Sequence, residues 1–168
     1  MIERGYQGTS IDAIAARAGV GRPTIYRRWR TKAHIIHDAV YPTIEPMPLD
    51  PAEITEHVAA LVAGAYALFG TPAARAGVPG LMSDTRSDPE LRKRLVTEQL
   101  GPVREVVGGL IADASATGAI RPGVDVDTIV DVLAGAAIFA LSVRDAELTD
   151  DLVEQMTELI VHGIMPGD

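Results

Sequence analysis

The sequence of 168 residues contains no cysteine. This absence excludes a disulfide framework, a thiolate metal site and a cysteine nucleophile. Aromatic residues are also few, at 4% of the chain, whereas hydrophobic residues together reach 47%. A hydrophobic content that rests mainly on Ala, Val, Leu and Ile, in a chain long enough to bury a core, favours a helix-rich globular protein.

Long uninterrupted hydrophobic runs are absent as well. Polar residues such as Glu3, Arg4 and Asp12 interrupt the N-terminal segment, so no signal peptide is predicted there. The least polar stretch, residues 129–143, contains Asp131 and is shorter than a helix that spans a bilayer. We therefore expect a cytoplasmic protein that makes no contact with a membrane.

The residues that could form an enzyme or metal site are scattered. Among the four histidines only His34 and His37 are close in sequence, and Asp38 is the one acidic residue beside them. That set is too small for a metal site. Ser83 and Ser87 have no neighbouring base, and there is no glycine-rich phosphate loop. We predict no enzyme activity, no metal and no cofactor.

The formal net charge of −8 is unevenly divided along the chain. Residues 1–40 hold seven Lys and Arg against three Asp and Glu, whereas residues 41–168 hold eight against twenty. Such asymmetry indicates contact with a polyanion at the N-terminal end. The acidic remainder would repel DNA, and this repulsion would confine binding to that end.

The basic segment has the pattern of two short helices joined by a turn. Thr9 or Ser10 can cap the first helix, and Asp12 can close a capping box with Thr9. Gly19 can end this helix in a left-handed conformation, and Arg22-Pro23 can open the next. Apolar residues recur between these signals at the spacing of one helical face: Ile11, Ile14, Ala15 and Ala18.

The second helix would bury one face and expose a polar one. Ile25 and Trp29 share the face that can pack on Ile11 and Ile14. A short helix, a turn with glycine and a helix with a polar outer face is the pattern of a helix-turn-helix. A third helix would start at Thr31, with a lysine at its N-terminus, which is a natural phosphate site.

These residue types suit DNA. Arginine reads guanine with two hydrogen bonds and pairs with phosphate, while Thr and Tyr hydroxyls reach phosphates or base edges. Each arginine taken alone is more often a solvated surface residue, so the prediction depends on the combination. We expect base contacts from Arg22 and Thr24, and phosphate contacts from Thr9, Tyr26, Arg27, Arg28 and Lys32.

The segment also resembles the DNA-binding segment of the tetracycline-repressor (TetR) family of bacterial regulators. That family has a G-T-S/T cap, an A-x-x-A-G-V turn, and then T-[IL]-Y-x-x-[FW]-x-x-K. The sequence meets this pattern over roughly residues 5–40, with Gly8-Thr9-Ser10, Ala15-Arg17-Ala18-Gly19-Val20, Thr24-Ile25-Tyr26, Trp29 and Lys32.

The resemblance implies a transcriptional regulator, with repression the expected mode. In this family a helix-turn-helix module precedes a larger helical domain, which binds a small effector and dimerises through its last two helices. The regulator would bind a palindromic operator as a homodimer and release it when the effector binds. The family's first helix precedes the motif, whereas this sequence begins close to it.

We therefore expect the natural protein to start further upstream, with the first helix missing here. A truncated product is one alternative. Another is a helical ligand-binding or partner-binding dimer that has lost DNA binding through truncation.

The rest of the chain predicts further helices and no strands. "PTIEPMPLDP" reads as a proline-rich connection over residues 42–52. It separates a partial helix-turn-helix domain, residues 1–41, from an effector-binding and dimerisation domain, residues 53–168. The fold class is all-α. Helices are expected over 53–70, about 73–84, from 88 with a break at Gly101-Pro102, 126–143 and 149–163.

Two further sites are predicted in the C-terminal domain. The first is an apolar cavity for an effector, which we expect to be a largely hydrophobic organic molecule rather than a metal or a nucleotide. The residues that could line it, each of which could equally be ordinary core, are His57, Tyr66, Phe69, Met82, Val103, Val107, Ile111 and Phe139. The expected helix over residues 126–143 is apolar almost all round, so it needs burial on more than one side. A dimer interface would bury it in this way, and so would a central position in the core of a monomer. The expected interface residues are Ala134, Ala137, Leu141, Leu152, Met156, Leu159 and Ile160.

Overall fold

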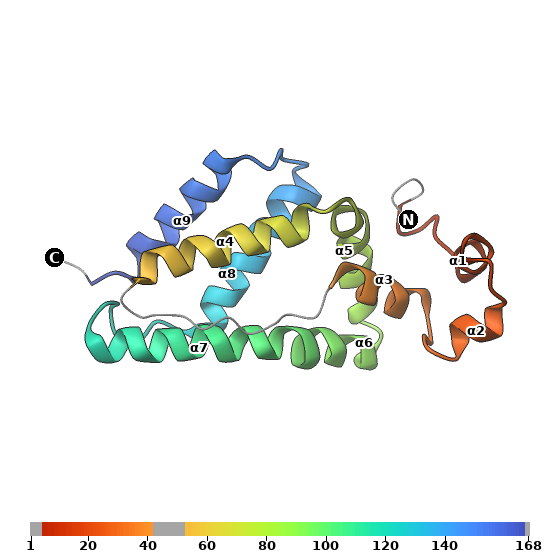
Figure 1. Cartoon of the computed structure of the whole chain (residues 1–168), viewed down its shortest axis with the longest axis horizontal. Helices are drawn as coiled ribbons and strands as arrows, with labels where there is room; N and C mark the ends of the chain where they lie inside the picture. The colour runs from red at the N-terminus through yellow and green to blue at the C-terminus, as the bar shows by residue number, and fades with distance from the viewer. Residues whose placement is uncertain (1–4, 42–52, 167–168) are drawn as a thin grey trace.

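The computed structural model describes residues 5–41 and 53–166, and every regular element within them is a helix (Figure 1). The predicted all-α class is therefore confirmed. The elements in chain order are α1 (Ile11–Ala18), α2 (Arg22–Tyr26), α3 (Lys32–Val40), α4 (Ile54–Gly70), α5 (Pro72–Thr85), α6 (Pro89–Lys93), the π-helical segment η2 (Arg94–Gln99), α7 (Leu100–Thr117), α8 (Val126–Ile138), the π-helical segment η3 (Phe139–Val143) and α9 (Asp150–Ile164).

Local signals set the ends of the first two helices. Ser10, rather than Thr9, caps α1, because its Oγ accepts a hydrogen bond from the Ala13 backbone N–H at 3.2 Å. Gly19 ends α1 with a φ of 66°, in the left-handed region that a side chain disfavours. Pro23 lies in the first turn of α2, where its missing N–H costs nothing.

The long helices form a bundle with α4 at its centre. The helix α4 contacts α5, α8 and α9, and α8 crosses between α4 and α7 and contacts both (Figure 1). Apolar side chains from all of these helices meet in one core. Its most buried members are Val62, Tyr66, Ala74, Val78, Leu91, Ala114, Ala137 and Leu141.

One long continuous helix is made of α6, η2 and α7. Asp88 caps its start by accepting hydrogen bonds from the backbone N–H groups of Glu90 and Leu91. The sequence predicts a break at Gly101-Pro102; instead the helix widens to a π-helix just before that point. Proline lacks the N–H for the helical ladder and its ring crowds the carbonyl four residues earlier, so a wider turn there relieves the conflict.

The segment from Val126 to Val143 is one helical stretch of 18 residues with a mean hydropathy of 1.9. The prediction that this apolar stretch is too short to span a bilayer is wrong. The helix that contains residues 129–143 begins three residues earlier, at Val126. By length and composition alone the helix could span a bilayer. One third of it is buried inside the protein, where α8 packs on α4 and α7.

The N-terminal helices lie at one end of the bundle. The N-terminal segment contacts the bundle through α3, which packs on α5, and through Tyr6, whose hydroxyl donates to Asp84 of α5, while α1 and α2 project beyond (Figure 1). Ala33, Ile36 and Val40 are the α3 residues that enter the common core. This arrangement leaves α2 at the tip of an elongated molecule.

Candidate DNA-binding surface and its attachment to the core

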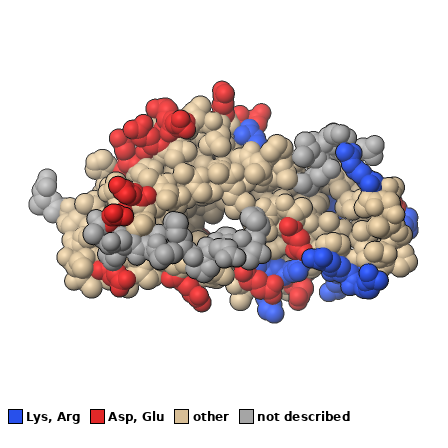
Figure 2. Space-filling view, viewed as in Figure 1, with Lys and Arg blue, Asp and Glu red and all other residues tan. Residues whose placement is uncertain are grey.

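The outer face of α2 is polar and open to solvent. Ile25 is 6% exposed and anchors the helix, whereas the residues on its other sides are exposed. The predicted contact residues among these are Arg22, Thr24, Tyr26, Arg27 and Arg28. Figure 2 shows Lys and Arg side chains around this end of the molecule, while Asp and Glu side chains gather over the region of α9.

Arg22 forms an ion pair with Asp12 on α1. Both side chains are more than half exposed, at 63% and 58%. An exposed ion pair contributes little to stability because water screens it and two long side chains must be ordered. The guanidinium can therefore exchange this carboxylate for a base edge or a phosphate at small cost. Asp12 does not close the predicted capping box with Thr9, because the Thr9 backbone N–H donates to the Tyr6 carbonyl at 3.3 Å and Ser10 is the cap.

The predicted phosphate contact of Thr9 is wrong. Thr9 is 7% exposed, and its hydroxyl donates to the Gly5 carbonyl at 2.8 Å. The side chain is used to shape the turn before α1, and it has no path to a DNA backbone. The sequence cannot distinguish this role from capping, because Thr9 and Ser10 are both good capping residues and only one can occupy the position.

Lys32 holds the N-terminal segment against α3. Its Nζ donates to the Tyr6 carbonyl at 2.9 Å and lies 4.5 Å from the centre of the Tyr6 ring. An ammonium has three donors, so a phosphate contact at the same Nζ is compatible with this hydrogen bond. Thr31 begins α3, but its hydroxyl bonds to Nδ1 of His34 at 2.8 Å rather than to the helix backbone.

Trp29 follows α2 and makes a contact that its spacing in the sequence does not indicate. Its Nε1–H donates to Oδ2 of Asp38 at 2.8 Å, and the Arg28 guanidinium lies 4.8 Å from its ring. Asp38 also accepts from Arg94 of η2, with 3.2 Å between Oδ1 and Nη1. In the sequence Asp38 stands out only as a neighbour of two histidines, and nothing in the pattern around Arg94 indicates this contact.

His37 is buried beside this cluster. Its Nδ1 lies 3.3 Å from Oδ1 of Asp38, its ring packs on Tyr41 at 5.1 Å, and its Nε2 has no hydrogen-bond partner among the described residues. Burial lowers the pKa of His37 below its ordinary value of 6.5, and the nearby Asp38 only partly opposes this. The neutral ring is therefore the form that the folded protein favours.

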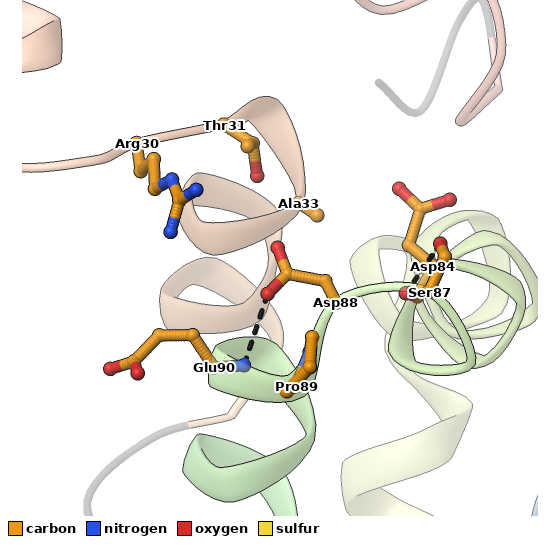
Figure 3. A pocket seen from close by; sticks show the side chains of 8 residues that line it. All are labelled: Arg30, Thr31, Ala33, Asp84, Ser87, Asp88, Pro89 and Glu90. Carbon is orange, nitrogen blue, oxygen red and sulfur yellow. Dashed lines mark hydrogen bonds between the residues drawn. The ribbon is translucent and has the colours of Figure 1, made fainter.

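An open polar cleft of about 620 Å³ marks the joint between the N-terminal helices and the core (Figure 3). Arg30, Thr31 and Ala33 lie on one side, and the α5–α6 corner with Asp84, Ser87, Asp88, Pro89 and Glu90 lies on the other. Two of its carboxylates already have structural roles, because Asp88 caps α6 and Asp84 accepts the Tyr6 hydroxyl at 2.5 Å.

The residues predicted to line an effector cavity do not all meet. Tyr66, Phe69 and Val107 are buried in the core, and His57, Val103 and Ile111 are half-buried. Met82 and Phe139 are 42% and 57% exposed, so their assignment to an internal cavity is wrong. The reason is helical phase: each lies on a face of its helical segment that is open to solvent.

An internal apolar cavity of about 20 Å³ does lie between α4, α7, α8 and α9. Val107 and Ile111 are the predicted residues that line it, together with Ile54, Val58, Leu61, Leu110, Ile120, Val124, Ile129, Leu133, Ile160 and Ile164. Its volume suits about one water molecule.

The predicted dimer residues also divide by burial. Ala137, Leu141 and Ile160 are 0%, 1% and 6% exposed inside the protomer, so they cannot form an interface and that assignment is wrong. Ala134, Leu152 and Met156 are half-buried, and Leu159 is 66% exposed. The large apolar side chains that α8, η3 and the region of α9 present to solvent are Val132, Phe139, Val143, Leu148, Leu159 and Met165.

Comparison with known proteins agrees with this architecture. Residues 1–39 match the profile of bacterial regulatory proteins of the tetR family, and residues 48–160 match the tetracyclin repressor-like C-terminal domain. An uncharacterized HTH-type transcriptional regulator of Bacillus subtilis, YdeS, is 25% identical over 167 residues, which cover 98% of this chain and 83% of that protein.

Two further relatives agree. An uncharacterized HTH-type transcriptional regulator of Mycobacterium tuberculosis, Rv2250c, is 31% identical over 131 residues, which cover 73% of this chain and 65% of that protein. A solved structure of a Clostridium perfringens protein, described as a candidate regulator of fatty acid metabolism, has the same fold with a TM-score of 0.59 and 24% identity, over 99% of this chain and 94% of that one. The chain therefore belongs to the TetR family of bacterial transcriptional regulators.

Proposed function

We propose that the protein is a cytoplasmic repressor that binds a palindromic operator as a homodimer and releases it when a small, largely hydrophobic molecule binds. The observation that carries this proposal is the exposed polar face of α2 at the basic end of the chain. In a helix-turn-helix the second helix enters the major groove with its N-terminal residues towards the base edges.

The positions on α2 suggest how the contacts are divided. Arg22 and Thr24, near the N-terminus of α2, would read base edges, whereas Tyr26, Arg27 and Arg28 would contact phosphates. Lys32 would add a phosphate contact at the start of α3. We propose a DNA-binding domain over residues 1–41 and an effector-binding and dimerisation domain over residues 53–168; the predicted connection, residues 42–52, lies outside the described residues.

The dimer would form through the outer faces of α8, η3 and α9. Phe139, Val143 and Leu159 are each more than half exposed. Exposed apolar groups of this size on neighbouring helices suit an interface between two copies, because water is removed from both. Two copies related by a twofold axis would place two α2 helices at two half-sites of a symmetric operator.

The effector would enter the apolar space among α4, α7, α8 and α9. The cavity there, at about 20 Å³, is far below the several hundred Å³ of an ordinary ligand pocket. An effector must therefore separate these helices, so it would select a conformation other than this one. Since the lining is apolar, it would favour a hydrophobic organic molecule over a metal ion or a nucleotide.

The test of DNA binding is a selection from random double-stranded oligonucleotides at low salt, followed by titration of the enriched sequence. We expect a twofold-symmetric sequence, with an affinity that falls as salt rises. Enrichment of no sequence would contradict the proposal, and a helical ligand-binding or partner-binding dimer without DNA binding would then take its place.

The test of the effector is a thermal-shift screen of lipophilic compounds against divalent metals and nucleotides. A ligand present at 100 times its Kd should stabilise the folded protein by about 2.7 kcal/mol. The same compound should also release the enriched DNA. Stabilisation by metals or nucleotides, with none from lipophilic compounds, would contradict the proposed effector class.

A further inference from the structure

A chain of side-chain contacts joins the end of α2 to the core. Asp38, on α3, accepts a hydrogen bond from the Trp29 indole on Oδ2 at 2.8 Å and from the Arg94 guanidinium on Oδ1 at 3.2 Å. The two oxygens of one carboxylate thus face different parts of the molecule. One is bound to the DNA-binding end, and the other to η2 in the core.

The environment of Asp38 favours this arrangement. Its side chain is 30% exposed and that of Arg94 is 28% exposed, so water screens the pair less than it would a surface pair. Burial alone would raise the pKa of Asp38, but hydrogen bonds from Trp29 and His37 and the charge of Arg94 outweigh it and lower the pKa. The carboxylate is therefore charged at neutral pH, and charge-assisted hydrogen bonds are the stronger kind.

Trp29 passes this constraint on to the DNA-contacting side chains. Its backbone N–H donates to the carbonyl of Ile25, the buried anchor of α2, at 3.0 Å. Its ring lies beneath the Arg28 guanidinium. A shift of the indole therefore moves the C-terminal end of α2 together with one of its proposed phosphate contacts.

Arg94 is placed by an unusual piece of helix. It is the first residue of η2, and its Nε also lies 3.9 Å from Oε2 of Glu98, one turn later in the same π-helical segment. π-helical turns are wider than α-helical ones and often occur at functional positions. From this segment the Arg94 guanidinium reaches Oδ1 of Asp38 on α3.

We propose that Asp38 and Arg94 are positioning residues for DNA binding, which hold Trp29, and through it Arg28 and the end of α2, in the arrangement that fits the operator. This inference rests on the operator binding proposed above. Neither residue needs to touch DNA. Their role is to connect the orientation of α2 to the helix that lines the core.

Loss of the contact between Asp38 and Arg94 should leave the protein folded, because the N-terminal segment is also attached to the core at a second place that does not involve these two residues. Tyr6 donates its hydroxyl to Asp84 of α5, and α3 packs on α5 through its apolar face. The variants below therefore test the placement of α2 and not the presence of the fold. Circular dichroism and thermal unfolding check this assumption directly.

The experiment uses the fact that Trp29 is the single tryptophan of the chain. Arg94→Gln removes the charge that faces Asp38, and Arg92→Gln is its matched control, because it changes the net charge equally two residues away. Within the described residues, Arg92 donates hydrogen bonds to the carbonyls of Thr85 and Arg86, which precede the start of the same helix. Trp29 emission and operator affinity, measured by anisotropy, are the two readouts.

We expect Arg94→Gln to lower operator affinity roughly tenfold, the usual size of a coupling between distant sites. Sequence preference should not change, and Trp29 emission should shift although Arg94 does not contact the indole. Arg92→Gln should change neither readout, and Arg94→Lys, which keeps a donor for Asp38, should retain most of the affinity. Trp29→Phe should also weaken binding, and adding it to Arg94→Gln should cost less than the sum of the two.

Two outcomes separate the inference from the function on which it rests. A wild-type chain that selects no DNA sequence overturns both. If the wild type binds a selected operator and Arg94→Gln matches Arg92→Gln in affinity and in Trp29 emission, the operator function stands and the positioning role is overturned alone.

Discussion

The ring of Tyr6 lies directly against Gly80 of α5, and residue 80 has no room for a β-carbon. One helical turn further along α5, Asp84 accepts the Tyr6 hydroxyl at 2.5 Å. Lys32 completes the arrangement by donating to the Tyr6 carbonyl. A residue that precedes α1 is thus fixed to the core and to α3 at once, which places the start of the DNA-binding end on α5.

Replacing Gly80 by alanine should displace Tyr6 and destabilise the protein by about 1–3 kcal/mol, the usual cost of overpacking a fitted contact. Chemical unfolding measures this change in the free energy of unfolding. Gly64→Ala is the matched control, because Gly64 is also helical and has nothing within 4 Å of its would-be β-carbon. The control should stabilise the protein by about 0.5–1 kcal/mol. Equal effects of the two substitutions would contradict the contact.

Arg22→Ala should weaken binding to the selected operator by about 1–3 kcal/mol and relax the sequence preference at one base pair of each half-site. Asp12→Asn should do the opposite to affinity, because it frees the Arg22 guanidinium and removes a negative charge that faces DNA. Arg121→Ala, at the far end of the bundle, is the control for net charge. An Arg22→Ala protein with unchanged preference would show that Arg22 does not read a base.

Phe139→Asp should convert the dimer to a folded monomer, since it places a charge where an exposed ring would meet the partner copy. A central aromatic interface residue is typically worth about 2 kcal/mol or more. Light scattering gives the mass, and circular dichroism checks that the helices remain. Met82→Asp, at another exposed apolar residue, should leave the mass unchanged. A wild-type chain that is already monomeric at micromolar concentration would contradict the interface.

Acid should destabilise the protein through His37. The folded state lowers the pKa of this ring below 6.5, so the unfolded chain binds a proton more readily. The contribution to stability is fully present above pH 6.5 and decreases as the pH falls below that value. His37→Phe keeps a ring against Tyr41 but cannot titrate, and urea unfolding at pH 7.5 and 5.5 should show a smaller loss on acidification than in wild type. Equal losses in both proteins would assign the acid sensitivity to other groups.

The starts and ends of helices could be predicted from the sequence because they depend on residues that are close together along the chain. Gly19, Asp88, Asp125 and Thr149 act where their residue types predict, through a left-handed φ or a capping hydrogen bond. The polar face of α2 follows for the same reason, since one helical period fixes which side chains oppose Ile25.

Contacts between distant segments could not be predicted in this way. Asp38 and Arg94 lie 56 residues apart, and no spacing rule joins them. The helix from Val126 to Val143 is apolar almost all round, so its pattern does not indicate which side meets α4. The pattern predicts Ala137 and Leu141 at the interface, whereas the packing of α8 and η3 places them in the core and leaves Phe139 exposed.

The separation of basic and acidic residues between the two ends gives the elongated molecule an electric dipole along its length. In the field of a DNA duplex such a dipole experiences a torque that turns the α2 end towards the phosphates before any contact forms. In the proposed search for the operator, fewer random rotations are then needed, because the field turns the protein into the binding orientation before contact. At physiological ionic strength the field extends over only about 8 Å, so this alignment occurs during the last step of approach and while the protein slides along DNA.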